Sequence, residues 1–133
     1  MIDSKQVIVA VRGHMPEGKL ASQVAHAAVA NVLNMEYTRH TKDGVVYLTL
    51  TYPENSSEQH WMEESFTKVL LGVDTQEEML AIYEKAKAKG MNVSLIEDEG
   101  RTVFNGVTTI TCVGIGPASR AAIDIITGHL KCY

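Results

Sequence analysis

The fold of this chain is decided by residues 6–29, QVIVAVRGHMPEGKLASQVAHAAV. The first six of these residues form a continuous apolar, β-branched run, which is typical of a strand buried on both faces. The link from Arg12 to Gly18 is rich in turn residues, and a helical period begins after it. A strand, a short loop and a helix in this order open a β-α unit. Because open α/β sheets bind ligands at the carboxyl ends of their strands, we expect Arg12, His14 and Lys19 on the ligand side.

The predicted helix has two faces of different chemistry. At 3.6 residues per turn, its apolar side chains fall in one stripe, formed by Leu20, Val24, Ala27 and Ala28. A second face carries Lys19, Gln23 and His26, and Lys19 lies in the first turn, where free N–H groups and the helix dipole attract anions. Alternatively, these three are a solvated lysine, an exposed amide and a hydrogen-bonded core histidine. The stretch by itself leaves both interpretations open.

The remaining chain alternates strands and helices. Further strands are predicted at residues 45–52, 67–73, 92–96 and 107–115. The first helix should end near Met35, with the polar residues 37–43 breaking it, and a second helix should run from Asp74 to just before Gly90. A last helix is predicted from Pro117 to about Thr127, with four residues facing inward: Ala121, Ala122, Ile125 and Ile126. This order indicates an α/β protein in which the strand at 45–52 extends the sheet or forms a flap.

Composition limits the class of protein. With 133 residues, of which 45% are hydrophobic, we expect one domain over residues 1–133. No apolar run approaches the length of a membrane span and no secretory signal opens the sequence, so a cytoplasmic protein is expected. Cys112, Cys132 and the five histidines have no metal-ligand spacing, and the glycines form no nucleotide-binding motif, so neither a metal nor another cofactor is implied. The net charge of −4 argues mildly against nucleic acid, although the acids crowd residues 54–64 and 74–84, away from most motifs.

Asp98 and Thr102 bracket Glu99-Gly100-Arg101 just beyond a predicted strand. A carboxylate in such a place can take a proton from water, a hydroxyl can orient that water, and Lys19 can stabilise negative charge on a tetrahedral intermediate. Because no nucleophilic cysteine or serine stands out, direct attack by water is the simplest scheme. The alternative is a turn acid and a turn hydroxyl that bond to nearby backbone.

Four stretches resemble the peptidyl-tRNA hydrolase 2 family in residues, order and approximate spacing: GKLASQVAHAAV at 18–29, VSLIEDEGRT at 93–102, TITCVGIGPA at 109–118 and TGHLKCY at 127–133. The first is similar to the family signature Gly-Lys-x-Ala-x-Gln-x-x-His-Ala. The resemblance implies a three-layer α/β/α sandwich with a mixed sheet of four core strands. It also implies frequent homodimers and hydrolysis of the ester that joins a peptide to the 3′ end of tRNA.

Position by position, the resemblance implies that Lys19, Asp98 and Thr102 are catalytic and that Gln23, His26 and Arg101 lie near the substrate with Arg12 and His14. His129 matches a C-terminal Gly-His-Leu, interpreted as structural. The sequence departs from the family in its shorter, less basic loop at 12–18, where His14 replaces an acid, and in an insertion at about 37–66. Two alternative functions remain: a non-catalytic module that binds a protein through the strand at 45–52, and a hydrolase of another acyl or peptidyl conjugate.

Overall fold

A computed structural model describes residues 3–98 and 106–133, so Arg101 and Thr102 lie outside the described residues. The elements are, in order, β1 (Ser4–Val11), α1 (Glu17–Leu33), β2 (Tyr37–Lys42), β3 (Val45–Leu50), α2 (Ser57–His60), the π-helical turn η1 (Trp61–Ser65), β4 (Lys68–Val73), α3 (Gln76–Ala88), β5 (Val93–Asp98), β6 (Thr109–Ser119), α4 (Arg120–Thr127) and β7 (Lys131–Cys132). Among these helices, none is long and apolar enough to cross a membrane.

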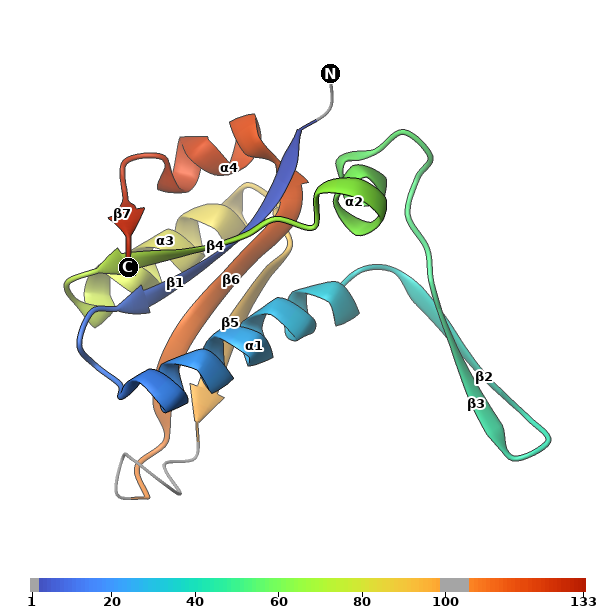
Figure 1. The fold of residues 1–133 in the computed structure, drawn as a ribbon, viewed down its shortest axis with the longest axis horizontal. Helices are drawn as coiled ribbons and strands as arrows, with labels where there is room; N and C mark the ends of the chain where they lie inside the picture. The colour runs from blue at the N-terminus through green and yellow to red at the C-terminus, as the bar shows by residue number, and fades with distance from the viewer. Residues whose placement is uncertain (1–2, 99–105) are drawn as a thin grey trace.

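Five strands form a mixed sheet in the order β5-β6-β1-β4-β7. β1 and β4 are parallel, and β6 runs antiparallel to both β1 and β5. The carboxyl ends of β1, β4 and β5 therefore share one edge of the sheet, at which α1 also begins (Figure 1). The four predicted core strands are present. The fifth strand is the two-residue β7 from the C-terminus, which is too short to leave a periodic signal in the sequence.

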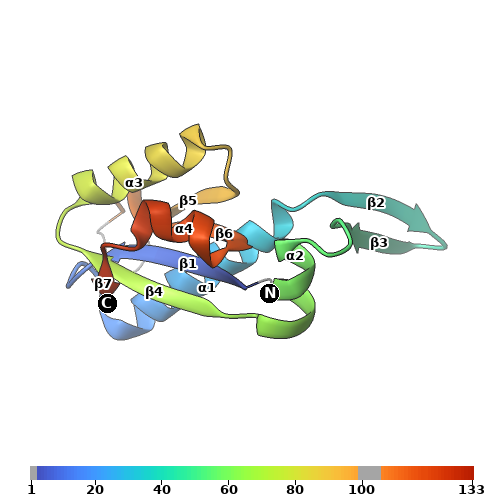
Figure 2. The ribbon, with the colours of Figure 1, turned by 90° about the horizontal axis from the view of Figure 1, so that it is seen from above.

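Helices cover both faces of this sheet, as predicted for an α/β/α sandwich. Figure 2 shows α3 and α4 on one face and α1 on the other. The alternation of β1 divides its side chains between the two: Val7 and Val9 pack in the core cluster under α3 and α4, and Ile8 and Ala10 pack in the cluster under α1. Burial on both faces explains why this strand has a continuous apolar sequence.

The segment at 37–50 differs from the prediction. Residues 37–43 were expected only to break the first helix, but residues 37–42 form β2, which pairs with β3 in a separate two-stranded hairpin. The predicted strand at 45–52 is confirmed as β3, although it does not join the main sheet. Asp43 and Gly44 connect the two strands with φ values of 52° and 76°, as the tight turns favoured in two-residue hairpins require. The Asp-Gly pair was the available signal for this hairpin.

The inward face predicted for the last helix was wrong in part. Ile126 is buried as expected, but Ala121 is exposed, and Ile125 is 62% exposed while Ile123 is buried instead. The helix begins at Arg120, capped by the Ser119 hydroxyl, and residues 117–119 belong to β6. The buried positions 123, 126 and 127 follow i, i+3 and i+4 spacing, so they share one face of the helix. That face is the one that meets the sheet.

The two cysteines are expected to differ strongly in reactivity toward a thiol reagent. Burial raises the pKa of Cys112 to about 11, with a smaller opposing effect of a hydrogen bond with Thr111, whereas Cys132 is exposed. Since the thiolate is the reactive form, about one Cys112 in a thousand is ionised at pH 8. Titration of the folded protein with Ellman's reagent should therefore show one fast thiol, and none in Cys132→Ser. Two thiols reacting at equal rates in the folded protein would contradict this burial.

Candidate functional site

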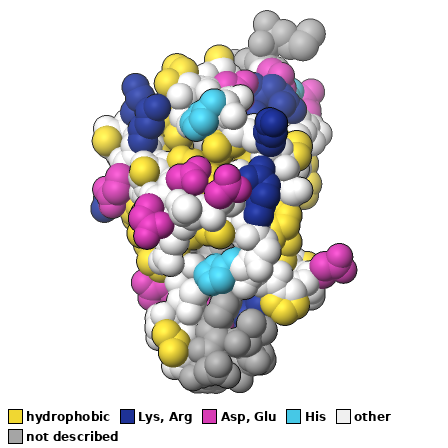
Figure 3. All heavy atoms as spheres, turned by 90° about the vertical axis from the view of Figure 1, so that its left-hand side faces the viewer, with side chains coloured by type: hydrophobic (Ala, Val, Ile, Leu, Met, Phe, Trp, Pro, Cys, Tyr) yellow, Lys and Arg dark blue, Asp and Glu magenta, His cyan; other side chains and the backbone are white. Residues whose placement is uncertain are grey.

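The carboxyl edge of the sheet gathers charged and polar side chains. Arg12 follows β1, Asp74 follows β4, and Asp98 ends β5, while Lys19 stands in the first turn of α1. Figure 3 looks onto this side of the molecule, where cationic, acidic and histidine side chains lie near one another. This is the edge at which open α/β sheets bind their ligands.

Lys19 and Asp98 form a salt bridge across this edge. The Nζ atom of Lys19 donates to Oδ1 of Asp98 at 2.7 Å, and the two side chains are only 14% and 16% exposed. The predicted convergence of a helix-start amine and a distant strand-end acid is thus confirmed, although the roles of the two groups stay predictions. A charge-assisted bond with so little water around it is stronger and better positioned than a surface ion pair.

A β-bulge next to the pair fixes α1 to the sheet. The β5–β6 register shifts between Ile96, opposite Cys112, and Glu97, opposite Ile110, which leaves Thr111 as the extra residue. Because of this extra residue, Thr111 and Cys112 both face α1, while Ile110 and Val113 pack on the opposite side. Bulges beside functional sites commonly redirect a side chain in this manner.

Gln23 is the hydrogen-bond partner of the redirected Thr111 side chain. The Thr111 hydroxyl donates to Oε1 of Gln23 at 2.7 Å, and both side chains are buried. Gln23 lies one helical turn beyond Lys19, so this hydrogen bond holds the first turns of α1 in place on β6. The structure therefore places Gln23 in the interface between α1 and the sheet, and its predicted place near the substrate stays a prediction.

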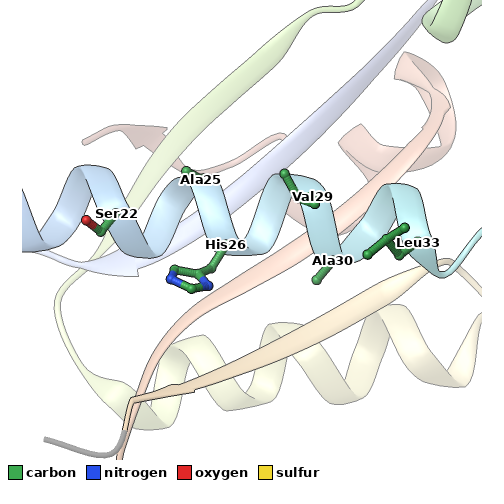
Figure 4. Close-up of a pocket in the computed structure, with 6 residues that line it drawn as sticks. All are labelled: Ser22, Ala25, His26, Val29, Ala30 and Leu33. Atoms are coloured by element: carbon green, nitrogen blue, oxygen red, sulfur yellow. The ribbon is translucent and has the colours of Figure 1, made fainter. Parts of the chain in front are cut away.

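The other candidates near the start of α1 are spread along the edge. Arg12 donates to Oδ1 of Asp74 at 3.2 Å, on the β4 side of the edge, and His14 lies half-buried in the loop after it. β4 and β5 are three strands apart in the sheet, so their ends lie about 14 Å apart at the usual strand spacing. His26 is exposed on the outer face of α1, where it lines a shallow groove (Figure 4). Two of the predicted residues, Lys19 and Asp98, are thus in direct contact with each other.

Tyr133 belongs to the site region and was not predicted. The N–H of Gly13 donates to the Tyr133 hydroxyl at 2.9 Å, so the last residue of the chain anchors the loop between β1 and α1. Thr111 was missed as well. Neither residue leaves a signal in the sequence, because each meets its partner across about ninety residues or more of intervening chain.

Three candidates remain: Arg101, Thr102 and His129. Arg101 and Thr102 lie outside the described residues, so their positions relative to Lys19 and Asp98 are predictions only. His129 is exposed after α4 and lines a groove with α3, in the layer opposite α1. Within residues 3–98 and 106–133 no group of three His, Cys, Asp or Glu side chains is placed to hold a metal ion.

Fold and site together define the class: a three-layer α/β protein with a nearly buried amine–carboxylate pair at the ligand-binding edge of its sheet. Comparison with known proteins narrows this class to one family. The family model for peptidyl-tRNA hydrolase PTH2 matches residues 4–133. The chain therefore belongs to the peptidyl-tRNA hydrolase PTH2 family.

Individual relatives agree with this assignment. A peptidyl-tRNA hydrolase of Sulfolobus acidocaldarius is 37% identical over 125 residues, which cover 94% of this chain and 95% of the relative. One of Nanoarchaeum equitans is 39% identical over 129 residues, covering 97% and 98%. A solved structure of a protein of unknown function from Agrobacterium tumefaciens covers 100% of this chain and 99% of its own, with a TM-score of 0.54. At 15% identity, that likeness concerns the fold alone.

Proposed function

We propose that this protein hydrolyses the ester bond between peptide and tRNA in peptidyl-tRNA. Membership of the PTH2 family, whose curated relatives are named peptidyl-tRNA hydrolases, supports this substrate. The observation that carries the proposal at the level of residues is the 2.7 Å contact between Lys19 and Asp98. It puts a cation and a proton acceptor together at the edge where the substrate ester would bind.

In the proposed mechanism, water attacks the ester carbonyl carbon while Asp98 accepts a proton from that water. Thr102 orients the water, and Lys19 stabilises the negative charge that develops on the carbonyl oxygen. The bond between the carbonyl carbon and the ribose oxygen then breaks, and the proton held by Asp98 passes to the leaving ribose oxygen. The products are a tRNA with a restored hydroxyl and the peptide carboxylic acid, which loses its remaining proton to solvent and becomes the carboxylate, so the enzyme is unchanged.

The proposed substrate contacts follow the same edge. Arg12, His14 and Arg101 are the residues that we propose contact the tRNA part of the substrate. Gln23 has a positioning role, because its buried hydrogen bond with Thr111 holds the first turns of α1 in place on the sheet. His26 lies seven residues beyond Lys19, about 10 Å along the helix, and is exposed toward the groove in which a substrate group could rest.

Two further statements belong to the proposal. The enzyme acts in the cytoplasm, the compartment in which peptidyl-tRNA arises during translation. It also acts as a homodimer, for which the support is the exposure of large apolar side chains on α1 and on the β2–β3 hairpin, among them Val29, Leu33 and Leu48.

The test compares two substrates that carry the same ester. One is an N-acetyl-aminoacyl-tRNA, and the other is the same N-acetyl-aminoacyl group on adenosine, which lacks the tRNA body. We expect release from the tRNA ester, with a KM that rises on the order of 20- to 40-fold between about 50 and 200 mM salt if three phosphates are contacted. The KM for the adenosine ester should stay constant, because it offers no phosphate.

The outcomes separate the proposed function from its alternatives. Release of the tRNA ester at the rate of buffer alone would contradict hydrolysis and favour a non-catalytic module. Equal, salt-independent KM values for the two esters would instead show that the tRNA body is not recognised. That result would favour a hydrolase of another acyl or peptidyl conjugate.

A further inference from the structure

Gly72 in β4 lies directly against the side chain of Arg12. A methyl group added at Gly72 would lie 2.7 Å from Cζ and Nε of Arg12 and 2.9 Å from its Cγ. Carbon atoms in contact are normally about 3.5–4.0 Å apart, so a residue with a Cβ atom does not fit here while Arg12 keeps its place. The arginine therefore lies along the backbone of β4, and glycine at position 72 is what allows this.

Strand alternation places Arg12 on the same face of the sheet as the amine–carboxylate pair. Arg12 follows β1 two residues after Ala10, which packs in the cluster under α1. Gly72 likewise comes two residues after Leu70, which packs against the same cluster. Lys19 projects from α1 on this face. The guanidinium and the pair are thus at one edge and on one face of the sheet, where a single substrate can contact both.

Two polar contacts also hold the guanidinium of Arg12. Its Nη2 atom donates to the backbone carbonyl of Lys131 in β7 at 3.4 Å, and its Nη1 atom donates to Oδ1 of Asp74 at 3.2 Å. The Asp74 side chain is 80% exposed, and ion pairs as exposed as this one contribute little. The close approach to Gly72 is therefore the tighter constraint on where the guanidinium lies.

The guanidinium of Arg12 is suited to bind a phosphate. It has five N–H donors, of which the contacts with Lys131 and Asp74 use two, and the side chain is 37% exposed. Arginine can bind a phosphate through two parallel N–H bonds, and it loses less conformational freedom on binding when its planar fork is already held in place. Gly72 therefore favours phosphate binding by holding Arg12 before the ligand arrives.

The sheet determines how far this guanidinium lies from the ester. Arg12 lies along β4, whereas Asp98 ends β5, three strands and about 14 Å away. A stacked nucleic-acid strand advances about 3.4 Å per nucleotide, so this separation corresponds to about four nucleotides. When the ester lies at Lys19 and Asp98, Arg12 is within reach of a phosphate close to the 3′ end of the tRNA.

We propose that Gly72 is a positioning residue, which holds Arg12 along β4 so that its guanidinium binds the tRNA phosphate about four nucleotides from the ester. This inference rests on the proposed function and adds to it one residue of the enzyme and one place on the substrate. Gly72 acts through Arg12 and not on the ester. A larger residue at position 72 should therefore raise KM and leave kcat unchanged.

Two esters of different length test the proposal. The N-acetyl-aminoacyl group is placed on adenosine and on a hexaribonucleotide that ends in the same adenosine. In Gly72→Ala, we expect KM for the hexanucleotide ester to rise about tenfold, with kcat within about twofold of wild type, because one charge-assisted contact is lost. Both constants for the adenosine ester should stay unchanged. The slope of log KM against log salt for the hexanucleotide ester should decrease by about 0.7, as for one phosphate of a single strand.

Arg12→Ala is the background that shows whether Gly72 acts through Arg12. It removes the atoms that the added methyl group would meet, so Gly72→Ala should then change neither KM nor the free energy of unfolding any further. Arg120→Ala is the matched control for Arg12→Ala. Arg120 is 39% exposed and pairs with the exposed acid Asp3, but it starts α4 at the opposite edge of the sheet. Its substitution should leave both KM values within about twofold of wild type.

Each other outcome contradicts the proposal in a recognisable way. A folded Gly72→Ala variant with wild-type KM for the hexanucleotide ester would overturn it. Equal increases in KM for both esters, or a further increase in the Arg12→Ala background, would show a general effect on the fold instead. If the wild-type enzyme hydrolyses both esters with the same KM, this inference is wrong and the proposed hydrolysis stands. If it releases peptide from neither ester nor from N-acetyl-aminoacyl-tRNA, both are wrong.

Discussion

Replacing Lys19 with methionine is expected to lower kcat/KM for peptidyl-tRNA hydrolysis about 10²- to 10³-fold, the usual loss on removing one donor to a developing oxyanion. Methionine keeps much of the length and apolar stem of lysine but cannot carry the charge. The amine lies beside Asp98 in a setting that is mostly shielded from water, where a positive charge acts strongly. Steady-state release of peptide from N-acetyl-aminoacyl-tRNA measures the effect.

Lys87→Met is the control for this substitution. Lys87 lies on the exposed side of α3, in the layer opposite α1, and the same substitution there should leave kcat/KM within about twofold of wild type. Lys19→Met also removes the Lys19 cation from beside the carboxylate of Asp98, so the free energy of unfolding should fall. The loss should be smaller than the roughly 3–5 kcal/mol lost when a fully buried pair is broken. A folded Lys19→Met variant with wild-type kcat/KM would contradict the role of Lys19.

Replacing Asp98 with asparagine is expected to lower kcat about 10²- to 10⁴-fold, the usual contribution of a general base. Asparagine has nearly the same shape as aspartate, and its amide oxygen can still accept the hydrogen bond from Lys19. It cannot take a proton from water. The loss should therefore be mainly in kcat, with KM for peptidyl-tRNA little changed.

Asp74→Asn is the matched control for Asp98→Asn. Asp74 ends at the same edge of the sheet and also pairs with a cation, Arg12, but it is 80% exposed. Because exposed pairs contribute little, this variant should keep kcat within about twofold of wild type and lose less than about 1 kcal/mol of stability. An Asp98→Asn variant that retains more than a tenth of wild-type kcat would show that another group takes the proton.

The fold could be predicted from the sequence where one residue pattern allows one structure. The apolar run at residues 6–11 and the helical period after it determine the β-α unit, and the segments 67–73 and 107–115 form core strands for the same reason. Of the two strands of the hairpin, β3 was predicted and β2 was not, because β2 is polar at nearly every position. Its strand character comes from pairing with β3, not from its own periodicity. The inward face of α4 depended on which side of the helix meets the sheet, and the spacing of its apolar residues did not give that side.

The candidate site was predictable only in part. Lys19 and Asp98 each stand at the end of an element, and strand ends meet at one edge of an α/β sheet, so their convergence follows from topology. The bulge at Thr111 and the anchoring of Gly13 by Tyr133 depend on register and on chain-end packing, which one sequence does not specify. The burial of Gln23 could not be predicted, because helical spacing gives an angle around the axis but not the depth of burial.

The central claim is that Lys19 and Asp98 act together on the ester rather than only joining α1 to β5. The double variant Lys19→Met/Asp98→Asn removes both charges, so it should recover much of the stability that Lys19→Met alone loses. Single-turnover hydrolysis of N-acetyl-aminoacyl-tRNA with enzyme in excess measures its chemical step directly. We expect a well-folded double variant whose rate is about 10³-fold or more below wild type. A double variant that is equally well folded and hydrolyses within tenfold of wild type would contradict the claim and leave the pair a structural one.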